Sequence, residues 1–252
     1  MSGERKGERR QFHTTRWTLV ASAAEGGGAD ASAALEALCG AYWYPLYAFL
    51  RRRGSDESEA ADFVQGFFAE LIEKDYVAQA DRERGRFRGF LLVSLQHFAS
   101  KQRAKERALK RGGGRLHLPL DFEDGERRYR LEPVDGLTPE AIFERRWALT
   151  ILERTMARLS AHYDDGGATK RERFEALQPC LGGEAPPYRD VGLRLGISET
   201  AVKVAVHRMR ARYRDCLRQE IAETVYDPAE IDDEIRRLMQ ALTRTAGGLP
   251  RS

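Results

Sequence analysis

The sequence of 252 residues lacks any long hydrophobic run. No apolar stretch approaches the roughly 20 residues that a membrane-spanning helix needs. The opening segment "MSGERKGERRQF" is basic and polar, without the apolar centre of a secretory signal. We therefore expect residues 1–11 to be disordered and the protein to be cytoplasmic, with no membrane contact.

Cysteine and histidine are also scarce. The three cysteines, Cys39, Cys180 and Cys216, lie far apart and form no C-x-x-C pair, which argues against a disulfide framework or a zinc site. The five histidines are His13, His97, His117, His162 and His207. Their spacing suits neither a metal site nor a catalytic centre. We expect buried or incidental thiols, no metal, no cofactor and no enzymatic activity.

Strand signals are almost absent, because the best candidate, "LHLPLDF", is short and contains a proline. Helical periodicity predicts helices over about 32–53, 57–75, 87–110 and 139–162, the last capped by Thr138 before Pro139. The glycines of "RGGGR" and the Pro/Gly-bearing segment after them separate two helical blocks. We predict an all-α fold of two small helical domains joined by an extended linker at 112–137.

Positive charge is concentrated in two blocks on either side of the acidic stretch "DFEDGE". The first block contains Lys101, Arg103, Lys105, Arg107, Lys110, Arg111 and Arg115. The second contains Arg208, Arg210, Arg212, Arg214 and Arg218. One such run is usually a solvated helix face, but two blocks favour a nucleic-acid surface.

The stretch "YRDVGLRLGISETAVKVAVHRMRARYR" has the layout of a helix-turn-helix. Gly196 would provide the turn between a short helix and a second helix, which Ser198 would cap. An apolar stripe marks the buried side of the second helix, and the remaining face is basic. The candidate DNA-contacting residues are Ser198, Thr200, Lys203, Val204, His207, Arg208 and Arg210. A plain helical hairpin with a solvated basic face is the alternative.

The first basic block continues an amphipathic helix whose distal half, "ASKQRAKERALKR", has almost no apolar residue. This half must therefore be solvated or lie on a polyanion such as DNA. The preceding segment "DFVQGFFAELI" places Asp62 and Gln65 on the polar side of a helix with a phenylalanine-rich face. These polar residues are either simple surface residues or a docking edge for a partner.

Three segments occur in a fixed order: "EAADFVQGFFAELI", "RFRGFLLVSLQHFASKQRAKERA" and the helix-turn-helix stretch. Together they resemble the extracytoplasmic-function group of sigma-70 family bacterial sigma factors. The resemblance implies region 2 over 12–111, a linker over 112–137 and region 4 over 138–224. Residues 225–252 extend beyond the minimal family pattern, and we predict a C-terminal amphipathic helix there from the residues themselves. It also implies binding to core RNA polymerase and to promoter DNA, without a catalytic site. Whether an anti-sigma factor or another regulator also binds is left open.

The resemblance assigns roles residue by residue. It implies that Asp62, Gln65 and Phe68 dock on the clamp helices of the polymerase largest subunit, although Ala60, Ala61 and Gly66 leave this helix with fewer acids than the family commonly has. The residues implied to contact the minus-10 element are Arg86, Arg88, Lys101, Arg103 and Lys105. The helix-turn-helix candidates would contact the minus-35 element. The linker acids Asp121, Glu123, Asp124 and Glu126 would either mimic phosphates in the polymerase cleft or belong to an ordinary soluble linker.

Two other functions stay open: a helix-turn-helix regulator that acts without polymerase and, more distantly, a nucleic-acid-processing enzyme. The tail "TVYDPAEIDDEIRRLMQALTR" predicts a further amphipathic helix, with Asp227 as its cap before Pro228. This helix would either extend the core of region 4 or clasp region 2 in the free protein.

Overall fold

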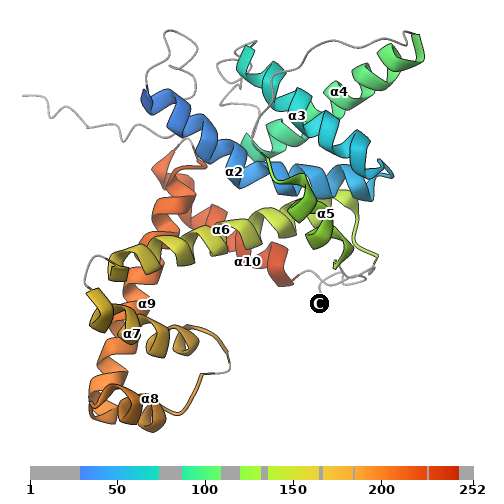
Figure 1. Cartoon of the computed structure of the whole chain (residues 1–252). Helices are drawn as coiled ribbons and strands as arrows, with labels where there is room; N and C mark the ends of the chain where they lie inside the picture. Colours follow the sequence, from blue (N-terminus) through green and yellow to red (C-terminus); the bar gives the residue numbers. More distant parts are fainter. Residues whose placement is uncertain are drawn as a thin grey trace, which may run out of the picture.

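The computed structural model describes residues 29–73, 87–108, 120–131, 136–164, 167–183, 185–225 and 227–243. Within these ranges every regular element is a helix and no strand occurs, so the all-α expectation is confirmed for them. The helices in Figure 1 are α2 (Ala29–Arg52), α3 (Glu57–Glu73), α4 (Phe87–Ala108), α5 (Phe122–Arg130), α6 (Pro139–Asp164), α7 (Gly167–Leu177), η2 (Gln178–Leu181), α8 (Tyr188–Leu195), α9 (Glu199–Ala222), η3 (Pro228–Glu230) and α10 (Ile231–Thr243).

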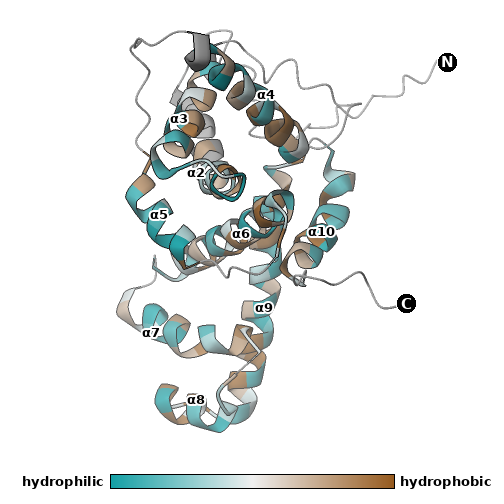
Figure 2. Ribbon diagram, turned by 90° about the vertical axis from the view of Figure 1, so that its right-hand side faces the viewer, coloured by the Kyte–Doolittle hydropathy of each residue, from teal (hydrophilic) through white to brown (hydrophobic). Residues whose placement is uncertain are grey.

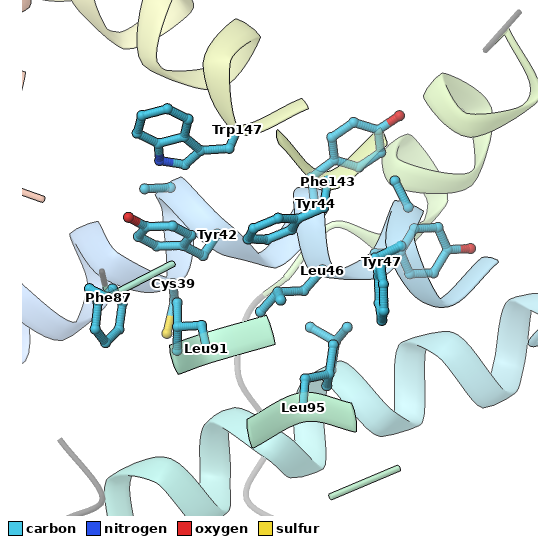
Figure 3. Close-up of a cluster of buried hydrophobic side chains, with 14 of the residues drawn as sticks. Cys39, Tyr42, Tyr44, Leu46, Tyr47, Phe87, Leu91, Leu95, Phe143 and Trp147 are labelled. Atoms are coloured by element: carbon cyan, nitrogen blue, oxygen red, sulfur yellow. The ribbon is translucent and has the colours of Figure 1, made fainter. Parts of the chain in front are cut away.

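The first of two hydrophobic clusters lies among α2, α3, α4 and the first half of α6, and it also takes in the end of α9 and α10. Figure 3 shows Trp147 of α6, Tyr42 of α2 and Leu91 of α4 following one another across it. The Tyr42 ring meets Phe87 edge-on, with centroids 5.6 Å apart. Burying each such large side chain contributes roughly 1.5–3 kcal/mol, so this cluster is the main source of stability.

The second cluster lies where α6, α7, η2, α8 and α9 meet. Its buried members include Leu159, Phe174, Leu177, Cys180, Val191, Val202, Val206 and Met209. All three cysteines are free and buried, as expected. Figure 1 shows α7, α8 and the first half of α9 as a lobe at one end of the molecule.

Helices α6 and α9 pass through both clusters. Ile151 of α6 belongs to the first cluster and Leu159 to the second, while Met209 of α9 belongs to the second and Ile221 to the first. The expected division of the chain at 112–137 therefore does not coincide with a division between hydrophobic cores. The first half of α6, assigned from the sequence to the second domain, packs mainly on α2.

A buried ion-pair cluster fixes α6 to α9. Glu220 of α9 is 3 % exposed and accepts from Arg154 Nε at 2.9 Å and Arg158 Nε at 2.6 Å. Burial alone would raise the pKa of Glu220, but the hydrogen bonds and charges of the two arginines lower it overall. The cluster therefore holds a carboxylate in its ionised form between the two helices.

The expectation of an extended linker at 112–137 is wrong for its described part, because residues 122–130 form α5. Asp121 caps this helix by accepting from the Asp124 N–H at 2.9 Å. Gly125 is where α5 approaches α2: a Cβ there would lie 2.8 Å from the Trp43 ring. A glycine in the predicted linker is thus a site of close packing rather than of flexibility.

The tail forms the expected helix, after one turn of 3-10 helix. Asp227 accepts from the Ala229 N–H at 2.8 Å, and α10 follows from Ile231. Figure 2 shows α10 beside α6. Ile231, Leu238 and Ala241 are buried in the first cluster, and α10 contacts both α6 and α9. The tail therefore belongs to the shared core of the folded chain.

Candidate nucleic-acid interface

Helix α8, a turn at Gly196 and helix α9 follow one another in the order that the predicted helix-turn-helix requires. Gly196 ends α8 at φ +65°, a left-handed conformation that glycine adopts without strain. The Ile197 N–H donates back to the Gly192 carbonyl at 3.0 Å. A Cβ on Gly192 would lie 2.7 Å from the Ile197 carbonyl oxygen, so both glycines are needed for this tight connection.

The second helix begins where expected. The Ser198 hydroxyl accepts from the Ala201 N–H at 3.2 Å, which satisfies one of the free amides of the first turn of α9. Val202, Val206 and Met209 point into the second cluster and are at most 2 % exposed. The apolar stripe thus fixes which face of α9 remains in solvent.

The opposite face of α9 carries most of the candidate DNA-contacting residues. Ser198, Thr200, Lys203, Val204, His207 and Arg208 are all exposed. Lys203 lies 2.9 Å from the Glu199 carboxylate, and this hydrogen bond raises the pKa of Lys203 and lowers the pKa of Glu199. Apart from this exposed pair, the face presents hydroxyl, imidazole, guanidinium and apolar groups at helical spacing, a mixture suited to the major groove.

Arg210 differs from the other candidates. Its Nη2 donates to the Cys180 carbonyl at 2.8 Å, so it fastens α9 to η2. Sequence reasoning also missed two exposed arginines on α8, Arg189 and Arg194. The charge of Arg189 contributes to the lowered pKa of Glu199, which places this arginine near the start of α9. The polar residues on one face of α8 in the sequence could have indicated that these two arginines are exposed beside α9.

Arg88 is not on a DNA-accessible surface, contrary to expectation. It is 5 % exposed and its Nε lies 2.7 Å from Glu144 Oε2 of α6. It also pairs with Glu234 of α10, and its guanidinium lies 4.2 Å from the centre of the Trp147 ring. Arg88 therefore joins α4, α6 and α10 in the interior.

The other residues expected to contact minus-10 DNA differ in whether they are exposed. Arg103 donates to the Glu59 carboxylate at 2.9 Å and to the Ser55 hydroxyl at 2.7 Å, so it ties α4 to the start of α3. Lys101 and Lys105 are exposed on the distal half of α4. Arg86 and most of the loop at 79–87 lie outside the described residues. Among the described minus-10 candidates, only Lys101 and Lys105 are therefore exposed on α4.

The three predicted polymerase-docking residues on α3 differ in their exposure to solvent. Asp62 is exposed and Gln65 is partly exposed, on the solvent side of the helix. Phe68 is 0 % exposed and belongs to the first cluster. The expected role of Phe68 as a surface contact is therefore wrong for this arrangement, because the apolar periodicity of α3 turns it inward.

The linker acids serve the fold. Glu126 is 4 % exposed and accepts from Tyr47 and Arg51 of α2 and from Arg130 of α5. Asp124 forms ion pairs with Arg127 and Arg128. Asp121 and Glu123 are exposed, whereas the carboxylates of Asp124 and Glu126 are engaged with arginines of the fold, so in this arrangement those two are not free to mimic phosphates.

Neither a metal centre nor a membrane span emerges from the described part of the chain. No group of three or more His, Cys, Asp or Glu side chains there could hold a metal ion. None of its helices is long and apolar enough to cross a membrane.

The comparisons with known proteins add no assignment. No protein-family model, curated protein or solved structure matches the chain. The function must therefore be argued from the helix-turn-helix and from the surfaces around it.

Proposed function

We propose that the chain is a sigma-type subunit of bacterial RNA polymerase, which binds core polymerase and directs it to specific promoters. The observation that carries the proposal is the helix-turn-helix with its exposed, basic α9. Its Gly196 turn and Ser198 cap present Thr200, Lys203 and His207 to solvent while the valine stripe is buried. Double-stranded promoter DNA is the ligand that such a surface fits.

The assignment to the sigma class depends on the order of segments in the sequence. The α3 segment with Asp62 and Gln65 comes first, the α4 segment with Lys101 and Lys105 follows, and the helix-turn-helix comes after both. Under the proposal α3 docks on the polymerase clamp helices, the lysines of α4 approach the minus-10 strand, and α9 reads the minus-35 element. The chemistry of RNA synthesis stays with the polymerase.

The burial of Arg88 and Phe68 defines a condition for this function. The segments that the proposal assigns to regions 2 and 4 contribute to one hydrophobic cluster in the isolated chain, because α6 packs on α2 and α10 contacts α6, α9 and Arg88 of α4. If polymerase docking requires Phe68, or if minus-10 contact requires Arg88, helices must separate on binding. If it uses only Asp62 and Gln65, the compact chain can dock as it is.

A second candidate function is a helix-turn-helix regulator that acts without polymerase. The observation that favours it is the burial of Phe68 and Arg88, because it removes one of the three residues expected to touch polymerase and one of the expected minus-10 contacts. Co-purification with core bacterial RNA polymerase separates the two. A stable complex with core enzyme supports the sigma proposal, whereas specific DNA binding with no such complex favours the regulator.

A further inference from the structure

One apolar side chain lies in the middle of the basic face of α9. Val204 is 46 % exposed, whereas Val202 and Val206 beside it in sequence are buried. It lies one helical turn after the exposed Thr200 and one turn before the exposed Arg208. Val204 therefore belongs to the DNA-facing side of the helix and not to the core.

We propose that Val204 reads the 5-methyl group of one thymine in the major groove and so determines specificity at that base pair. The inference rests on the proposed DNA-binding function. A valine side chain can neither donate nor accept a hydrogen bond, so it cannot read the polar edges of guanine, cytosine or adenine. The methyl group of thymine is the one apolar feature that a base edge presents there.

The position of Val204 suits such a contact. It is the sixth residue of α9, and in helix-turn-helix proteins the N-terminal part of the second helix approaches base edges. Lys203, His207 and Arg208 surround it with exposed cationic or hydrogen-bonding groups, which can hold the phosphates and orient the helix. A central apolar contact between such groups would be closed off from water in the complex, where burial of a methyl group is favourable.

The test removes the methyl group from the DNA. The full chain, alone and with core bacterial RNA polymerase, selects duplexes from a random pool, and each thymine of the selected sequence is replaced in turn by deoxyuridine. We expect one position at which wild-type protein loses about 4-fold in affinity, equivalent to about 0.8 kcal/mol for one buried methyl group. At that position Val204→Ala, whose shorter side chain reaches less far into the groove, should lose most of the difference between the thymine and deoxyuridine duplexes.

The matched control is Leu193→Ala, which removes an apolar side chain that is 74 % exposed on α8. It should keep the 4-fold penalty. A methyl group added at the same position as 5-methylcytosine should recover part of the affinity lost when cytosine replaces thymine.

The outcomes separate the inference from the proposed function. If the chain selects a sequence but no thymine shows the penalty, or if Val204→Ala keeps it, the inference is overturned and the DNA-binding function stands. If no sequence is selected with or without polymerase, both are overturned. Val204→Ala folds in either case, because alanine favours the helix and the site is not in the core.

Discussion

Replacing Glu126 by glutamine should destabilise the protein. This is not expected from the sequence, which predicts a flexible linker in this segment. Glu126 is 4 % exposed on α5. Its carboxylate accepts from Tyr47 Oη at 2.6 Å, and from Arg51 Nε and Nη2, each at 2.9 Å. Arg130 Nε adds a fourth contact at 3.1 Å. A neutral glutamine at this position would leave the Arg51 guanidinium without its counter-charge.

The expected size follows from these contacts. Breaking a buried ion pair by removing one partner costs about 3–5 kcal/mol. The low end applies here, because the Arg51 side chain keeps 20 % of its surface exposed and can recover some hydration. A loss of about 3 kcal/mol in the free energy of unfolding lowers the melting temperature of a chain of this size by roughly 6–12 °C. Thermal melting followed by circular dichroism measures it.

The effect should also depend on pH in a defined direction. Burial by itself raises the pKa of Glu126, but hydrogen bonds from Arg51, Tyr47 and Arg130 lower it overall. A lowered pKa means that the stabilisation is complete above the unfolded value of about 4.3 and is lost as the pH falls through the folded value. The difference between wild type and Glu126→Gln should therefore be full at pH 7 and shrink in acid.

The matched control is Glu123→Gln, an exposed acid on the same helix, which should change stability by less than about 0.5 kcal/mol. If Glu126→Gln melts like the wild type at pH 7, then α5 does not pack on α2 in solution. Residues 122–130 would then not be part of the folded core in solution.

Three further predictions concern the helix-turn-helix and α3. Arg208→Ala should weaken binding to all DNA sequences alike and reduce the slope of log affinity against log salt by about 1. Arg237→Ala on α10 should leave both the affinity and the slope unchanged. An unaltered slope in Arg208→Ala would show that Arg208 does not contact a phosphate. Gly196→Ala, at φ +65°, should cost about 1 kcal/mol in a urea unfolding experiment, while Gly183→Ala, which has open space around it, should cost much less; equal effects would argue against the turn. Asp62→Lys should abolish co-purification with core polymerase while the isolated variant stays folded by circular dichroism, and a variant that still co-purifies would show that Asp62 is not in the interface.

The elements that depend on local signals could be predicted from the sequence. The Ser198 cap, the Gly196 turn and the valine stripe of α9 each act within a few residues, so their pattern is visible in the chain itself. The same holds for the Thr138 cap before α6, where the Ala141 N–H donates to the threonine hydroxyl at 3.2 Å. Periodicity on α3 also indicated that Asp62 faces solvent.

What the sequence could not indicate was which charged groups meet across long sequence distances. Arg88 reads as a surface cation because its partners, Glu144 and Glu234, lie far along the chain. From the sequence, Glu126 is one of several acids in a polar stretch and would be expected in solvent. Only the packing of α5 on α2 brings it to Arg51. Composition treats both as solvated charges, whereas burial of a paired charge is a property of the tertiary fold.

The packing of α6 was hidden for a related reason. Its apolar positions fit a helix in either of the predicted domains, and nothing local shows that Trp147 packs on α2 while Leu159 packs with α7. Glycines in 112–137 suggested a flexible connection, yet a Cβ on Gly125 would lie 2.8 Å from the Trp43 ring, so α5 packs closely on α2 there. A two-domain division inferred from linker composition therefore missed a core shared by both halves.

We propose that this chain gives core RNA polymerase its promoter specificity through α9. Run-off transcription with purified core bacterial polymerase on a library of promoter sequences tests it most directly. We expect discrete transcripts from a subset of sequences when the full chain is added, and loss of most of that selection with the double variant Lys203→Ala and Arg208→Ala. Transcripts identical to those of core polymerase alone, in the presence of folded full-length chain, would contradict it.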